Sequence, residues 1–209
     1  MANCVSAAAI AFEEKDYAGA YEYYLRLRAN TSTGQTTQLA YDGLVKSGYN
    51  SGKFNETILY ADSLLSLNGA PDETMNDALY FKARSLQHFD SADAAIAIYK
   101  QLSGNKNGDI AAESRYRIAE LLFKQGNLKE AEAAANDAKQ LSAGYDYWVA
   151  KSYVLLADIL VSEKDYFNAK ALLESIVKHT KIAEIKQEAQ KKLDDLKVLE
   201  KKHTKLSEE

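Results

Sequence analysis

The sequence predicts an all-α fold: an α-solenoid of five stacked helix–turn–helix hairpins followed by a capping helix. Three observations lead to this prediction. Pairs of small residues recur at one fixed offset, apolar residues recur at helical spacing, and proline occurs once in 209 residues, at Pro71. Scarce proline suits long helices, because proline inside a helix removes a hydrogen bond and clashes with the preceding turn.

The fixed offset is the main signal. In five segments a small or β-branched residue is followed twelve positions later by another. The pairs are Ala8 and Ala20, Val45 and Thr57, Ala83 and Ala95, Ala119 and Ala131, and Ala157 and Ala169. The second members are 37, 38, 36 and 38 residues apart. Two helices approach closely only where side chains are small, so each pair predicts the crossing point of one hairpin.

Short polar turns separate the members of each pair, at residues 15–17, 52–54, 90–92, 126–128 and 164–166. Gly52 and Gly126 fit a helix C-terminus that needs a left-handed residue. Polar stretches that contain glycine or proline predict the loops between hairpins, at residues 29–35, 68–72, 104–109 and 142–146. The predicted repeats are therefore about 3–34, 35–71, 72–109, 110–145 and 146–180.

Residues 181–209 are predicted to form a capping helix to about Leu199, with a frayed tail from Lys201. Ile182, Ile185, Ala189, Leu193 and Leu196 recur at helical spacing, and the opposite face is charged. A terminal cap of a stack needs such a helix, with one face on the last hairpin and the other in water.

The stretches 126–131, 164–169 and 15–20 resemble the turn and second-helix start of tetratricopeptide repeats (TPR). The resemblance covers roughly residues 4–180 and implies a right-handed α-solenoid of about five TPR-like hairpins. Three features differ from the family pattern. The period is 36–38 rather than 34 residues, the repeat-ending proline is missing, and Thr57 replaces an alanine.

The segment from Tyr147 to Ile176 resembles the C-terminal repeats of large bacterial TPR proteins that are common in Bacteroidetes. This resemblance implies that the chain is the C-terminal part of a longer protein and that it is periplasmic or envelope-associated, although the chain carries no targeting signal. The first repeat starts without a cap, at Val5 and Ala8. The sequence therefore predicts either missing upstream repeats or self-association through this N-terminal edge.

Composition and motifs argue against several classes of function. A formal net charge of −4 without a basic block gives no reason to expect a nucleic-acid partner. No apolar run is long enough for direct membrane insertion. Cys4 is the only cysteine, and His88, His179 and His203 lack the helical spacing of a zinc site. No phosphate loop or nucleophile motif occurs. We therefore expect no enzyme, no cofactor and no metal.

In TPR stacks the first helix of each repeat lines a concave groove, so the resemblance implies partner-binding residues on these helices. They are Asp42, Lys46, Tyr49, Asn50, Tyr80, Arg84, His88, Tyr116, Glu120, Phe123, Lys124, Lys151 and Asp158. The predicted function is a non-catalytic scaffold that binds a protein or peptide in this groove, with Tyr49, Tyr80, Tyr116 and Phe123 as anchors. The alternative for each aromatic residue is packing between neighbouring first helices.

Two further functions stay open at this point. The chain could be a self-assembling structural module that uses its uncapped N-terminal edge. It could also be an accessory module of an envelope uptake system that binds a carbohydrate or peptide, which the groove tyrosines would permit.

Overall fold

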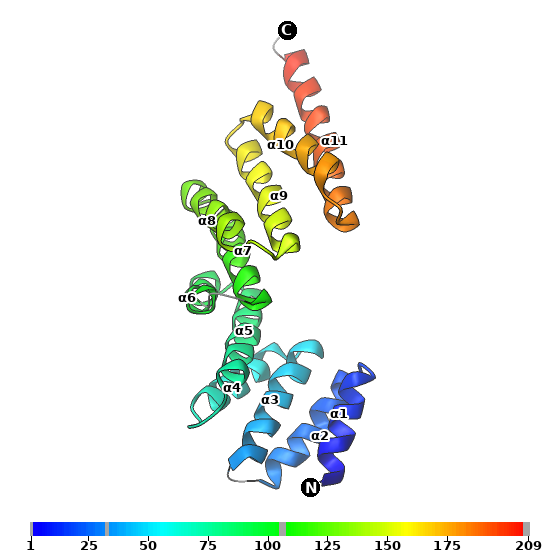
Figure 1. Ribbon diagram of the computed structural model, residues 1–209, viewed down its shortest axis with the longest axis vertical. Helices are drawn as coiled ribbons and strands as arrows, with labels where there is room; N and C mark the ends of the chain where they lie inside the picture. Colours follow the sequence, from blue (N-terminus) through cyan, green and yellow to red (C-terminus); the bar gives the residue numbers. More distant parts are fainter. Residues whose placement is uncertain (1, 32–33, 105–107, 207–209) are drawn as a thin grey trace. The chain divides into compact units, whose positions relative to one another are not determined.

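The computed structural model describes residues 2–31, 34–104 and 108–206. Within these residues the secondary structure consists of eleven helices without a strand (Figure 1). They are α1 (Ala2–Glu13), α2 (Tyr17–Ala29), α3 (Gly34–Asn50), α4 (Phe54–Leu65), α5 (Asp72–His88), α6 (Ala92–Ser103), α7 (Asp109–Lys124), α8 (Leu128–Leu141), α9 (Asp146–Ser162), α10 (Tyr166–His179) and α11 (Ala183–Leu206). None of these helices is long and apolar enough to cross a membrane.

The chain forms two compact units, Met1–Ile98 and Tyr99–Glu209, and the boundary falls within α6. In the first unit each helix from α1 to α5 packs against the next, and α3 also packs against α5. In the second unit each helix from α7 to α11 packs against the next, and first helices again meet, α7 with α9 and α9 with α11. This consecutive packing is that of a helical repeat array.

The predicted crossing points lie in the cores of the hairpins. All ten small residues are completely buried, with exposed fractions of 0%. Alanine at eight of the ten positions lets the paired helices approach closely. Val45 and Thr57 fill the same positions in the second hairpin, where the Thr57 hydroxyl donates to the Lys53 carbonyl within its own helix at 2.9 Å. All ten positions are therefore core positions, as the prediction of close contacts requires.

Every hairpin turn begins with a left-handed residue. Gly52 and Gly126 have φ angles of 78° and 79°, as predicted for glycines at helix ends. The corresponding positions in the other turns hold Lys15, Asp90 and Lys164, with φ between 54° and 65°. In the turn at Gly52 the Lys53 N–H donates to the Gly48 carbonyl at 2.8 Å, and the same six-residue bond recurs at the turns of Asp90, Gly126 and Lys164. In these four hairpins the bond closes the carbonyl end of the first helix.

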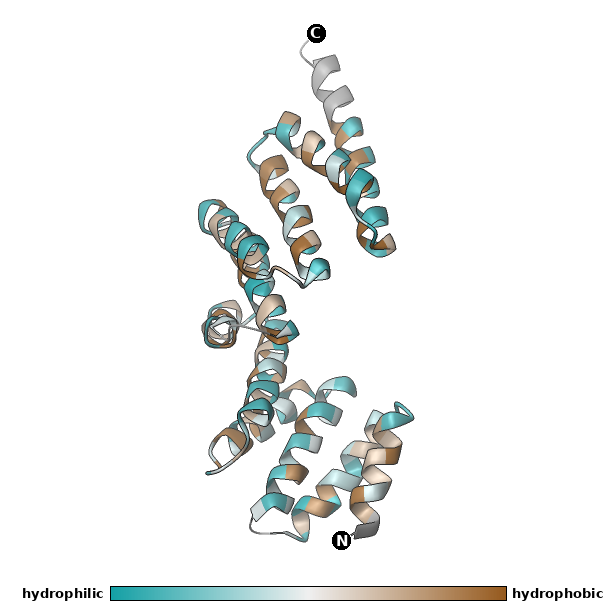
Figure 2. Ribbon diagram, viewed as in Figure 1, coloured by the Kyte–Doolittle hydropathy of each residue, from teal (hydrophilic) through white to brown (hydrophobic). Residues whose placement is uncertain are grey.

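Helix α11 packs one face on the last hairpin. Ile185, Ala189, Leu193 and Leu196 are buried with residues of α9 and α10. Figure 2 shows the mixed character of this helix, whose ribbon alternates between brown and teal. The predicted end near Leu199 was wrong, because the helical backbone continues to Leu206. Lysine, glutamate and leucine favour helix there, and no glycine or proline interrupts the segment. Residues 207–209, 32–33 and 105–107, which belong to the predicted tail and loops, lie outside the described residues.

Candidate functional site

The predicted partner-binding residues fall into two groups, one in each unit, and each group is described by itself. In the first unit, Lys46 of α3 joins two helices. Its ammonium lies 3.0 Å from Asp42 on the same helix and 2.7 Å from Asp77 on α5. Burial raises the pKa of Asp42, and Lys46 offsets this only in part. Asn50, one turn later, is exposed and donates to the Lys46 carbonyl.

Arg84 of α5 lies between two tyrosines of the predicted set. Its guanidinium carbon is 5.4 Å from the ring centre of Tyr49 and 5.6 Å from that of Tyr80, and it donates to the Tyr80 hydroxyl at 2.7 Å. Tyr49 also packs on Phe81, with ring centres 5.2 Å apart. These side chains are half-buried, so each one still presents part of its surface to solvent.

The aromatic contacts continue to the end of α5. The His88 ring stacks on Phe54 with centres 4.0 Å apart, and Phe89 meets Phe54 edge-on at 6.4 Å. His88 is exposed, and Phe89 keeps 43% of its surface exposed. We call this group the aromatic patch; it consists of Tyr49, Phe54, Tyr80, Phe81, Arg84, His88 and Phe89.

In the second unit, Tyr116 of α7 belongs to the core. Its exposed fraction is 5%, and its ring centre lies 5.6 Å from that of Trp148 on α9. Its hydroxyl donates to Glu120 at 3.3 Å, and burial raises the pKa of the phenol. Tyr116 therefore packs between neighbouring first helices, which is the alternative that the sequence left open for it. Phe123 is half-buried against the same core.

An ion-pair network lies beside Tyr116. Arg117 donates to Glu113 at 2.9 Å and to Glu120 at 3.0 Å. Its guanidinium carbon also lies 5.7 Å from the Trp148 ring centre. Lys124 is exposed and lies 3.8 Å from Glu120. Glu120 is thus held by contacts within α7.

The two predicted residues of α9, Lys151 and Asp158, form ion pairs with residues of α11. Lys151 donates to Glu188 at 2.9 Å, and Lys192 donates to Asp158 at 2.8 Å. One turn before Lys151, the Tyr147 hydroxyl donates to Glu184 of the same helix. Helix α11 therefore lies against the first-helix face of α9 and binds its charges.

Sequence reasoning missed several residues that shape these surfaces. Asp77, Phe81, Phe89, Arg117 and Trp148 were not among the predicted site residues. Neither Phe81 nor Trp148 was predicted as a site residue, because the contact that places each ring beside the site comes from a neighbouring hairpin. Phe54 was not a predicted site residue either, and lies in the predicted turn 52–54. Its stacking on His88 depends on the approach of α5.

Candidate metal ligands do not gather among the described side chains. Among them, no group of three or more histidine, cysteine, aspartate or glutamate residues is placed to hold a metal ion. His88 lies in the first unit and His179 in the second, while the side chain of His203 lies outside the described residues.

No protein-family model matches the sequence, and no curated protein matches it. Among the solved structures that share its fold are yeast Tom70 and BtubC (BKLC) from P. vanneervenii. Yeast Tom70 aligns with a TM-score of 0.65 and 17% identity over 93% of this chain and 39% of its own, so the chain spans about two fifths of the Tom70 chain. BtubC (BKLC) from P. vanneervenii aligns with a TM-score of 0.57 and 15% identity over 97% of this chain and 91% of its own. At these identities the likeness concerns the fold. The chain is an all-α solenoid with a TPR-like repeat fold.

Proposed function

We propose that the chain is a non-catalytic scaffold that binds a protein or peptide partner through the first-helix face of its first unit, at the aromatic patch. The structural neighbours are TPR-type helical repeat proteins, which favours a role in protein interaction. Fold alone does not assign a function, so the proposal depends on the surface chemistry of the patch.

The observation that carries the proposal is the position of Arg84 between Tyr49 and Tyr80. Aromatic residues and arginine supply most of the binding energy at protein interfaces. The two rings and the hydrogen bond to Tyr80 hold the guanidinium before a partner arrives, which reduces the entropy lost on binding. His88 and Phe89 extend this surface with exposed rings.

The first-helix residues of the second unit fit this role less well. Tyr116 lies in the core, and Lys151 and Asp158 bind α11. A partner would have to displace contacts there, whereas at the aromatic patch it would cover the exposed rings of His88 and Phe89 and the half-buried rings beside them. From the predicted residues, the proposed contact set keeps Tyr49, Asn50, Tyr80, Arg84 and His88. The structure adds Phe54, Phe81 and Phe89 to this set.

Affinity capture from a lysate of the source organism tests the proposal. The wild type is compared with a His88→Ala/Phe89→Ser variant, which changes only exposed side chains. Phe167→Ser is the matched control, because Phe167 is 81% exposed and belongs to the second unit. We expect one partner to be captured by the wild type and the control and lost by the double variant, with unchanged circular dichroism. Capture of the same proteins by all three would contradict the proposal.

A further inference from the structure

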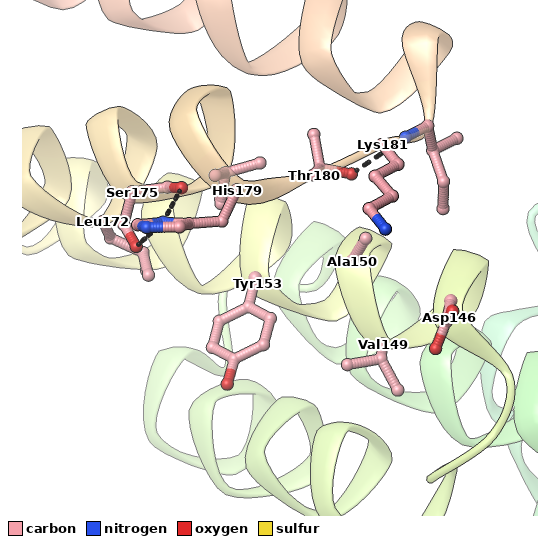
Figure 3. A pocket seen from close by; sticks show the side chains of 11 residues that line it. Asp146, Val149, Ala150, Tyr153, Leu172, Ser175, His179, Thr180 and Lys181 are labelled. Atoms are coloured by element: carbon pink, nitrogen blue, oxygen red, sulfur yellow. Dashed lines mark hydrogen bonds between the residues drawn. The ribbon is translucent and has the colours of Figure 1, made fainter.

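A pocket of about 570 Å³ opens in the second unit between the first turns of α9, the last turns of α10 and the link to α11 (Figure 3). Its apolar walls are Val149, Ala150, Leu172, Ile176 and Ile182. This volume lies within the range of ligand-binding clefts. None of the predicted partner-binding residues lines the pocket.

One repeat earlier, an arginine bridges the surface that corresponds to this pocket. Arg115 of α7 donates to the Ser103 carbonyl at 2.7 Å and to the Leu141 carbonyl at 3.1 Å, and so joins the ends of α6 and α8. The position 38 residues later holds Tyr153. In Figure 3 its phenol points away from the other pocket side chains, and the Lys139 ammonium of α8 lies 5.2 Å from its ring centre. Tyr153 therefore does not bridge the last groove.

Two opposite charges line this pocket without a partner. Lys181 and Asp146 lie at the same end, beside Ala150 (Figure 3). Within the part of the chain that the structure describes, neither side chain makes a hydrogen bond or an ion pair. The nearby Lys151 and Lys192, by contrast, are both paired with carboxylates. The pocket thus offers one cationic donor and one anionic acceptor beside an aliphatic wall.

We propose that this pocket binds a segment of a protein partner in which an aliphatic side chain lies between an acidic and a basic residue. The aliphatic side chain would pack on Val149, Leu172 and Ile176. The acidic residue would accept from Lys181, and the basic residue would donate to Asp146. A simple fatty acid fits less well, because its carboxylate could accept from Lys181 but it has no basic group to donate to Asp146.

Titration of the ¹⁵N-labelled full chain tests this proposal. The probes are acetyl-Glu-Leu-Lys-amide and its reverse, acetyl-Lys-Leu-Glu-amide, with acetyl-Glu-Ser-Lys-amide and its reverse as apolar-deletion controls. We expect shifts of the amide resonances of residues 146–153 and 172–182. The serine peptides should bind about tenfold more weakly, because they bury no aliphatic side chain.

Two protein variants complete the experiment. Lys181→Glu should weaken binding of the leucine peptide about tenfold or more, because it places a like charge beside the probe's carboxylate. Lys178→Glu is the matched control, an exposed lysine that does not line the pocket, and should leave the affinity unchanged.

Three outcomes would overturn the proposal: no shifts at the pocket with any peptide, equal affinities for the two variants, or tighter binding of octanoate than of the leucine peptides. The aromatic patch belongs to the other unit and is tested with different variants. Failure at the pocket therefore leaves the proposed function intact, and failure at the patch leaves the pocket proposal intact.

Discussion

Gly43 shows how closely helices approach in the first unit. A Cβ atom at this position of α3 would lie 2.3 Å from the ring of Tyr24 on α2, and Tyr24 is only 9% exposed. Replacing a helical glycine by alanine normally stabilises a protein by about 1 kcal/mol. Overpacking a core costs about 1–3 kcal/mol. Because the buried ring has little room to move, we expect Gly43→Ala to lower the free energy of unfolding, measured by urea denaturation.

A second substitution separates the clash from other effects. In a Tyr24→Leu background the ring is gone, so Gly43→Ala should cost less than in the wild type, and the two changes should be coupled. A stabilised Gly43→Ala single variant would show that α2 and α3 are not in such close contact.

Asp42 gives the first unit a defined pH dependence. Burial holds its pKa above the ordinary value of 3.8 despite the contact with Lys46. The folded state therefore binds a proton more readily than the unfolded state does, and the contribution of Asp42 to stability falls as pH rises from 3.8 through the raised pKa. Asp42→Asn lacks this loss. Its free energy of unfolding relative to the wild type should rise across that window and stay level above it, as measured by urea denaturation at a series of pH values.

Asp194 supplies a control of opposite sign. Hydrogen bonds from Gln190 and Lys197 hold the pKa of this exposed carboxylate below 3.8. Its contribution is present above the ordinary value and is lost as pH falls through the lowered pKa. The relative stability of Asp194→Asn should therefore fall as pH rises. A flat profile for Asp42→Asn, or the same sign for both variants, would disprove this account.

Helix α11 is the element that covers the last hairpin, and its contact combines apolar packing with polar contacts to α9 through Glu184, Glu188 and Lys192. Leu193 is 5% exposed and packs in the core that α9, α10 and α11 share. Leu193→Ala should cost about 2–5 kcal/mol through lost burial and a cavity. We expect faster amide hydrogen exchange in α11 and concentration-dependent association in sedimentation, since release of α11 exposes apolar surface on α9 and α10.

Val198 is the control for this prediction. It lies on the same helix but is 52% exposed, so Val198→Ala should change the free energy of unfolding by less than about 0.5 kcal/mol. If Leu193→Ala left the exchange of α11 unchanged, the packing of this helix on the last hairpin would not depend on its buried face.

At the scale of the whole chain, the fold was predictable because its main signal is local. The fixed offset reports a contact between two helices that are neighbours in sequence, and all ten residues are buried as expected. The left-handed turn residues were predicted only where they are glycine. Lys15, Asp90 and Lys164 adopt the same conformation. Lysine carries no signal for it, and aspartate, although enriched in the left-handed region, is also common at other turn positions.

The candidate site was less predictable, because it depends on which side chain arrives from another hairpin. Helical spacing places Tyr80 and Tyr116 on equivalent first-helix faces. Tyr116 is buried because Trp148 of α9 covers its ring, whereas Tyr80 stays half-exposed beside Arg84. Likewise, the rotation of α11 about its axis determines whether Lys151 is paired, and sequence spacing does not fix that rotation.

Repeat packing also predicts which helices a core substitution destabilises. Ala157 and Ala169 are both completely buried where α9 crosses α10, so Ala157→Leu must force these helices apart. Each repeat of such an array is stabilised mainly by its contacts with the adjacent repeats. Hydrogen exchange should therefore accelerate most in α9 and α10, less in α8 and α11, and least in α1 to α4. Ala171→Leu adds the same side chain at an exposed position of α10 and should leave exchange unchanged. Uniform acceleration in all helices would mean that the chain unfolds as one cooperative unit.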